Sequence, residues 1–242
     1  MKCPANSGSV YINYKKFFSQ ILTAWCDADY NVIWLEVGAE GSAGDGGVFE
    51  ASGAKHALEN NLLNFPAPEP LYPGGKPVPY FGAGDNAYPQ RRYLMTPYSG
   101  LLTLVMRLFN YRLSRARRVI ENFFGILAHK NRCILGCFQQ RPEVVTGIVK
   151  AAACMHNLQG LRYEYASNRE DYDYEDDNGV LRPGVWRSDM PVIAAMGMQP
   201  FQAINDSAEL REGKELRDYL AAYFCGRGQV SWQLQAIQNG WY

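Results

Sequence analysis

The chain has 242 residues and a formal net charge of zero, from 24 basic and 24 acidic residues. This balance excludes attraction of the whole molecule to nucleic acid, so any such contact must come from a local basic face. At 47% hydrophobic and 13% aromatic residues, the chain has enough apolar material for one large domain or one domain with an extension.

The six cysteines form no CxxC pair and no spacing typical of a zinc site. They are Cys3, Cys26, Cys133, Cys137, Cys154 and Cys225. Most have apolar neighbours, which predicts free, buried thiols in a reducing compartment. Met1 is not followed by an apolar stretch, so we expect no signal peptide. No run approaches the ~20 apolar residues that span a bilayer, so we expect no contact with a membrane.

The first third of the chain predicts a hairpin followed by a helix. Residues 17–26 and 32–37 are apolar runs typical of strands. The short polar connection 27–31 favours an antiparallel pairing between them. After a glycine-rich stretch, residues 46–63 carry apolar side chains at helical spacing, and we expect one helix there.

The next stretch is broken by prolines. Residues 64–77 contain five prolines and a Gly-Gly pair, which predicts an exposed loop. Residues 78–83 read as a short apolar strand, and a short helix is expected around residues 91–95.

Three longer helices are predicted in the second half. Residues 101–131 place Ile120, Phe123 and Leu127 on one buried face. Pro142 can open a helix that continues through residues 143–158. Residues 207–224 are amphipathic and end before Gly226.

Charge is concentrated in two segments of opposite sign. Residues 107–132 carry seven Arg or Lys and one acid, whereas residues 164–177 carry seven acids and one Arg. This asymmetry predicts a local basic face and a separate acidic segment. We expect residues 164–190 to be flexible, and the run 170–177 to be a solvated tail rather than a binding motif.

Two carboxylates are the strongest candidates for chemistry. Asp85 follows the apolar strand, and Glu121 comes 36 residues later on the basic helix. Carboxylates are the ligands that hard divalent cations prefer, and a pair of such cations can activate water for attack on a phosphodiester. Simpler readings remain open: Asp85 as a turn residue, and Glu121 in a solvated ion pair with Arg117 or Arg118.

Other polar residues also have two readings. Asp45 is either a further acidic ligand or the N-cap of the helix that follows it. His156 and Asn157 lie in an apolar helix, which favours a packed, hydrogen-bonded histidine over a metal ligand. Four arginines are candidates for binding DNA phosphates, with a solvated helix face as the alternative: Arg112, Arg115, Arg117 and Arg118.

The predicted order of elements indicates an α/β fold, and it fits the later part of a ribonuclease-H-like fold without its first central strand. Several ordered segments, spread over roughly residues 1–160, resemble the PIF/Harbinger-type transposase nuclease domain and its host-derived relatives. They are Cys3–Ser9 with Tyr11, Asn13, Tyr14 and Lys15; Val37-Gly38 with Gly41–Asp45; Gly84–Pro89; Phe109–Ser114 leading to Glu121 and Phe124-Gly125; and Met155–Leu158.

The resemblance implies a DDE endonuclease that hydrolyses DNA with Mg²⁺ or Mn²⁺. By position, Asp85 matches the second aspartate of the family, Glu121 its glutamate, and Asp45 a further acidic position. The family's first aspartate lies upstream of the Lys2-Cys3-Pro4 element and is absent here. We therefore expect impaired catalysis. The alternatives are a domesticated or decaying relative that binds DNA or protein without cleaving it, and a fragment of a gene model.

These considerations predict a nuclease domain over residues 1–160, incomplete at its N-terminus. An acidic flexible segment (161–205) and a helical C-terminal tail (206–242) follow it. The expected partners are DNA and a separate protein that supplies DNA recognition, because the DNA-binding region of the family is missing. The expected location is the nucleus, with the cytoplasm as the alternative.

Overall fold

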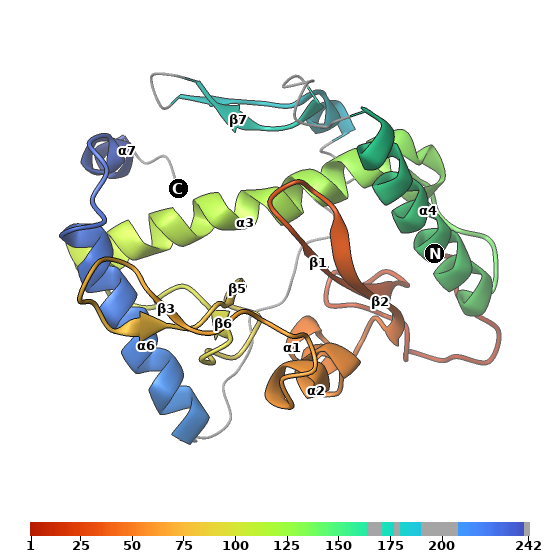
Figure 1. Cartoon of the computed structure of the whole chain (residues 1–242). Helices are drawn as coiled ribbons and strands as arrows, with labels where there is room; N and C mark the ends of the chain where they lie inside the picture. Colours follow the sequence, from red (N-terminus) through yellow and green to blue (C-terminus); the bar gives the residue numbers. More distant parts are fainter. Residues whose placement is uncertain (164–170, 177–179, 190–207, 240–242) are drawn as a thin grey trace. The chain divides into compact units, whose positions relative to one another are not determined.

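The computed structural model describes residues 1–163, 171–176, 180–189 and 208–239. They form a mixed α/β structure of two compact units (Figure 1). Unit 1 contains residues 1–52 and the described part of 118–199, and unit 2 contains residues 53–117 and the described part of the chain from residue 200 onward. The long helix α3 (Leu104–Lys130) contributes residues to both units. Among the described helices, none has the length and apolar character to cross a membrane.

Unit 1 begins with the predicted hairpin. Strand β1 (Gln20–Cys26) pairs antiparallel with β2 (Val32–Glu40), and Trp25 lies opposite Trp34. Asp27 starts the connecting turn, where its Oδ1 accepts hydrogen bonds from the backbone N–H groups of Asp29 and Asn31, each at 2.9 Å. This use of an aspartate side chain to close a turn explains why the connection needs so few residues.

The hairpin packs on α3 and on α4 (Pro142–Tyr163), and both helices occur where the sequence pattern predicted them. The buried centre is Phe123, Leu127 and Ala152, with Ala24 and Val32 packed against it. Phe123 is fully buried, which stabilises the unit by roughly 1.5–3 kcal/mol relative to an exposed side chain.

Two adjacent residues of α4 tie that helix to the hairpin. Asn157 accepts a hydrogen bond from the N–H of Val32 and donates one to its C=O, both at 2.9 Å. The buried His156 places Nε2 at 2.9 Å from the C=O of Tyr30, so Nε2–H is the donor. Burial is the main cause that lowers the pKa of His156. The prediction of a packed histidine is confirmed.

The single helix expected over residues 46–63 is wrong, because the chain forms two short helices. They are α1 (Asp45–Glu50) and α2 (Gly53–Glu59). The break is local: the hydroxyl of Ser52 donates to the C=O of Phe49 at 2.7 Å. In a continuing helix that carbonyl would accept from the N–H of Gly53.

Unit 2 contains two small ladders where one strand was predicted. Strand β3 (Glu69–Pro70) pairs antiparallel with β4 (Pro77–Val78), and β5 (Gly82–Ala83) pairs parallel with β6 (Leu94–Met95). The strand expected over residues 78–83 is therefore interrupted, because Pro79 has no N–H with which to continue a ladder.

The helix expected around residues 91–95 is also wrong, because this stretch turns tightly and enters β6. Arg91 and Leu94 exchange backbone hydrogen bonds of 3.0 and 3.1 Å. The buried side chain of Gln90 accepts bonds from the N–H and hydroxyl of Thr96 and donates to the C=O of Gly213 at 2.8 Å. These contacts with distant residues replace the local helical ones.

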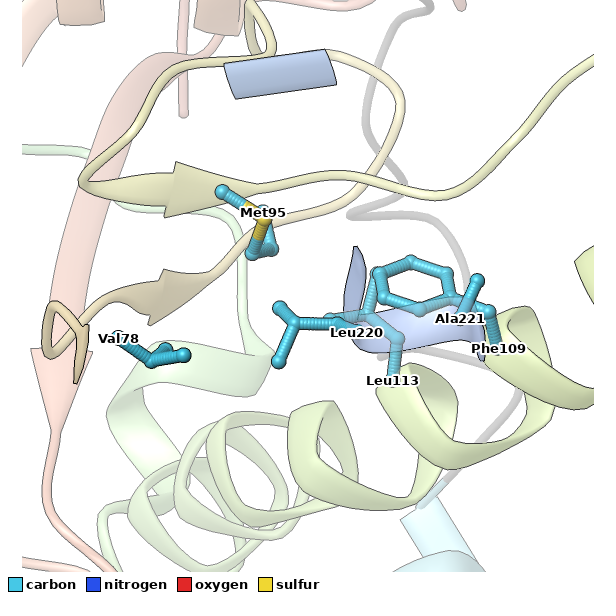
Figure 2. Packing of buried hydrophobic residues seen from close by; sticks show 6 residues of the cluster. All are labelled: Val78, Met95, Phe109, Leu113, Leu220 and Ala221. Carbon is cyan, nitrogen blue, oxygen red and sulfur yellow. The ribbon is translucent and has the colours of Figure 1, made fainter. Parts of the chain in front are cut away.

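The core of unit 2 is assembled from α3, the small strands and α6 (Ala208–Cys225), the amphipathic helix predicted near the C-terminus. Figure 2 shows its six buried side chains turned toward one another: Val78, Met95, Phe109, Leu113, Leu220 and Ala221. A second cluster fixes α7 (Gln233–Gln238) to α3 through Leu108, Tyr111, Ala236 and Ile237.

The described part of the acidic segment is folded, so the prediction of a solvated tail is wrong for these residues. It forms β7 (Tyr174–Glu175), β8 (Leu181–Arg182) and the 3-10 helix η4 (Val185–Asp189). Tyr172, Asp173 and Trp186 are buried, and Tyr172 and Trp186 pack on Ile126 of α3. Acidic and aromatic residues alternate in this segment, so its aromatic side chains form an apolar face. The high acidic content of the segment does not reveal this face.

The prediction of buried cysteines is also corrected. All six thiols are free, as expected, but Cys3, Cys133, Cys137 and Cys154 are exposed. Cys133 lies in the short 3-10 helix η1 (Arg132–Leu135). Cys26 is partly buried, and its surroundings raise the pKa of its thiol to about 12, first by burial and then through Asp27, so this thiol is poorly reactive.

The described residues form four separate two-stranded sheets. The ribonuclease-H-like topology with its missing central strand stays a prediction, as do the three domain boundaries.

Gly125 and Gly147 offer a matched test of how unit 1 packs. A Cβ on Gly125 would overlap the Trp186 ring, whereas one on Gly147 would meet open space. We expect Gly125→Ala to lower the free energy of unfolding by roughly 1–2 kcal/mol, because overpacking outweighs the gain in helix propensity. Gly147→Ala should raise it by roughly 0.5–1 kcal/mol. Urea unfolding followed by circular dichroism measures both, and equal effects would contradict the packing of Trp186 on α3.

Because the buried His156 has a lowered pKa, we predict that the folded protein loses stability in mild acid. The pKa of His156 is lower in the folded state than in the unfolded chain, where it is about 6.5. The unfolded chain then binds the proton first, so stability is full above pH ~6.5 and falls as the pH drops toward the folded-state pKa. Thermal unfolding between pH 7.5 and 5 checks this, with His156→Gln expected to flatten the decline. Unchanged stability of the wild type across this range would refute it.

Candidate functional site

Asp85 lies two residues beyond the end of β5 at Ala83, where the backbone is packed closely. A Cβ on the preceding Gly84 would come within 3.2 Å of Leu94, so this position favours glycine. Asp85 Oδ1 accepts a hydrogen bond from the N–H of Ala87 at 2.8 Å. Its Oδ2 lies 3.8 Å from Arg117 Nη2, and both side chains are mostly buried. Asp85 is therefore a turn-forming residue and an ion-paired carboxylate at once.

Glu121 is exposed on α3 in unit 1. The arginines proposed as its alternative partners have other carboxylates nearby: Arg117 pairs with Asp85, and Arg118 donates to Glu175 Oε1 at 3.0 Å. The pKa of Arg187 is raised, first by its hydrogen bonds to Asp173 and to a smaller extent by the charge of Glu121. Glu121 thus lies in a positive environment within its own unit.

Asp45 is the first residue of α1, and Gly44 is the N-cap, with a φ of 72°. The N-cap hypothesis for Asp45 is therefore wrong. An acid in the first turn of a helix still interacts favourably with the helix dipole.

These carboxylates are distributed over both units, with Asp45 and Glu121 in unit 1 and Asp85 in unit 2. In the described ranges of each unit, no three His, Cys, Asp or Glu side chains are grouped so as to hold a metal ion. Carboxylate oxygens have the right chemistry for Mg²⁺ or Mn²⁺, but the described residues of either unit do not by themselves complete such a site.

Two of the four candidate DNA-binding arginines hold the C-terminal helices of unit 2. Arg112 donates to the C=O of Gly228 at 3.2 Å and lies over the Phe224 ring. Arg115 lies over the Trp232 ring, with 4.0 Å between the guanidinium carbon and the ring centroid. Burial, followed by the charge of Arg115, lowers the pKa of Arg112. Both arginines therefore have a structural role in this unit.

Three asparagines form a recurring contact that sequence reasoning missed. Each uses its side-chain amide to accept from the N–H and donate to the C=O of a single distant residue. Asn110 binds Tyr98 in this way (2.8 and 2.9 Å), Asn122 binds Asp173 (2.9 and 3.1 Å), and Asn157 binds Val32. Asn110 and Asn157 lie in segments that carry the family resemblance, and Asn122 directly follows Glu121, but spacing does not reveal the partners of any of the three.

Asn122 has a further role beside Glu121. Its Oδ1 also accepts from the indole N–H of Trp186 at 3.0 Å, and its own side chain is fully buried. Asp173, likewise buried, accepts from the N–H of Gly184 at 2.8 Å and forms an ion pair with Arg187. The acidic segment is therefore anchored on the turn of α3 that carries Glu121.

The comparison with protein families identifies the chain. The sequence profile of the family described as DDE superfamily endonuclease matches residues 1–157. The chain belongs to this family. No curated protein and no solved structure was found to match it.

Within this DDE endonuclease family, the matched range includes Asp45, Asp85 and Glu121, and it ends at Asn157. The members of this family are endonucleases. Their substrate class is DNA, and they generally use divalent metals as cofactors. The acidic segment with β7 and β8, and the helices α6 and α7, lie beyond the match. The structure thus adds a folded extension to both units of the family domain.

Two substitutions of Asp85 separate the effect of its hydrogen bond to Ala87 from the effect of its charge. Asp85→Asn keeps an oxygen that can accept from Ala87, and we expect it to change the free energy of unfolding by less than ~0.5 kcal/mol. Asp85→Ala removes the acceptor and should cost ~1 kcal/mol. Urea unfolding of both variants makes the comparison. Equal losses would show that the ion pair with Arg117, rather than the turn, holds this residue in place.

Proposed function

We propose that this chain acts on DNA as a metal-dependent endonuclease of the PIF/Harbinger type, with catalysis impaired. The family match supports the nuclease class. The finer assignment rests on the ordered motifs that lead to Asp85 and Glu121. In this proposal Asp85 and Glu121 are the catalytic carboxylates, and Asp45 is a third metal ligand.

The observation that carries the proposal of impairment is the pairing of Asp85. Its carboxylate is compensated by Arg117 at 3.8 Å and by the N–H of Ala87. The charge of a carboxylate held in this way is already balanced by a guanidinium, so the fold does not need a cation to keep it in place. In the described part of each unit, three metal-binding side chains are not grouped together.

DNA contact is assigned to the basic stretch of α3. The side chains of Arg117 and Arg118 are mostly buried beside acidic partners, and a phosphate would compete with those partners for the guanidinium groups. Arg112 and Arg115 make their contribution by holding α7 and the end of α6. The net charge of zero supports a second protein that brings the chain to its target, and DNA as substrate supports a nuclear location.

A second candidate function is a relative that binds DNA or protein without cleaving it. The observation that favours it is that each of the four candidate arginines contacts another group of the chain. Under this reading the carboxylates and arginines are retained as parts of the fold.

Plasmid nicking and duplex binding, measured together, test the proposal. We expect binding that weakens steeply with salt, and slow nicking that requires Mg²⁺ or Mn²⁺. Glu121→Gln and Asp85→Asn should each reduce nicking at least ~10-fold while binding persists, by analogy with the cost of disturbing a metal site.

Each alternative gives a different result in this assay. Binding without any metal-dependent nicking favours the second candidate. Nicking that survives in both variants refutes the assignment of Asp85 and Glu121. Absence of binding at every salt concentration refutes action on DNA. Gly147→Ala, on an exposed helix surface, is the matched control for handling and folding.

A further inference from the structure

The acidic segment lies along α3 and is held there by several independent contacts. We call residues 171–176 and 180–189 the strap. It includes β7, β8 and η4, and Figure 1 shows the β7 hairpin beside α3. The strap and the part of α3 that it contacts, residues 118–130, belong to unit 1.

The strap is anchored by polar and aromatic contacts at its centre. Asn122 binds the backbone of Asp173 in both directions and accepts from the Trp186 indole. The Trp186 ring lies against Gly125, where any larger residue would collide with it. The surface of α3 is therefore complementary to the Trp186 ring at this point. This complementarity explains the glycine at position 125, one turn after Glu121.

Charged pairs extend this docking along the helix. Glu175 accepts from Arg118 at 3.0 Å, and Asp171 lies 3.8 Å from Lys130. The two basic residues are twelve positions apart, which is about 18 Å along a helix. The strap therefore places carboxylates on basic groups at both ends of the α3 segment in unit 1.

The strap also changes the surroundings of Glu121. Arg187 forms an ion pair with Asp173, whose side chain is fully buried. The negative charge of Glu121 contributes to the raised pKa of Arg187. Bound in this position, the strap occupies the guanidinium of Arg118 and places a cation near Glu121. The first of these effects opposes a DNA backbone that approaches this surface, since Glu175 competes with phosphate for Arg118.

From this geometry we propose that the strap is an autoinhibitory element that competes with DNA for α3. The proposal rests on the proposed function, because it requires that Arg118 contacts phosphate. Competition is energetically feasible, because Arg118 forms a charge-assisted hydrogen bond of similar strength with a carboxylate and with a phosphate. DNA binding then exposes the strap, and weakening of the strap strengthens DNA binding.

Glu175→Gln tests the strap with the smallest possible change. It keeps an oxygen that can accept from Arg118 but removes the charge. We expect the affinity for a fluorescently labelled duplex, measured by anisotropy at ~0.1 M salt, to rise roughly three- to tenfold, because phosphate then displaces a neutral amide and not a carboxylate from Arg118.

The matched control is Asp176→Asn. It removes the same charge from the same strap, but the Asp176 carboxylate bonds to Arg182 and to the N–H of Val180 within the hairpin. We expect less than a twofold change in affinity for this variant. Arg118→Gln combined with Glu175→Gln should cancel the gain, because the group that is released is then absent.

A second measurement follows the strap itself. Hydrogen exchange of residues 171–176 and 180–189 should accelerate when saturating duplex is added to the wild type. The proposal is overturned if the duplex binds while exchange of the strap stays unchanged, or if Glu175→Gln and Asp176→Asn have equal effects. In that case the proposed function still stands. If no variant binds the duplex, the proposed function fails, and the competitive role of the strap fails with it.

Discussion

The structure depends on one recurring contact, the side-chain amide of a helical asparagine that binds the backbone of a distant residue. Asn110 and Asn122 on α3 and Asn157 on α4 each satisfy one N–H and one C=O elsewhere in the chain. Buried backbone groups must be paired, and short ladders such as those found here leave many groups without a sheet partner. The asparagines supply those partners from the helices.

This contact links the fold to the candidate chemistry. Asn122 follows Glu121 and anchors the strap, so the carboxylate and the acidic segment share one turn of α3. On the same helix, Arg117 meets Asp85 and Arg118 meets Glu175. Part of the basic character of α3 is therefore compensated by acidic residues of the same chain. A DNA backbone must displace part of this compensation in order to bind.

Sequence reasoning was most accurate where local periodicity decides the outcome. The hairpin, α3, α4 and α6 were predicted close to their observed bounds, because helical and strand periods are written in consecutive residues. Prediction from the sequence was least accurate for residues 78–95, 171–176 and 180–189. There Gln90 reaches Gly213, and Trp186 reaches Asn122, and contacts of this range leave no periodic signal. The packed His156 was predicted correctly, because an apolar helix leaves a polar side chain few alternatives.

The sequence by itself determined the family of the chain, its main helices and its first hairpin, and it marked Asp85 and Glu121 as the residues of chemical interest. Only the tertiary structure decided which partner each of these residues and each arginine has. The physical reason is that a guanidinium or carboxylate can pair with any opposite charge that folding brings within reach, and residues 118 and 175 are 57 positions apart. Charge along the chain predicts a basic face, whereas packing of the strap determines how much of that face remains available.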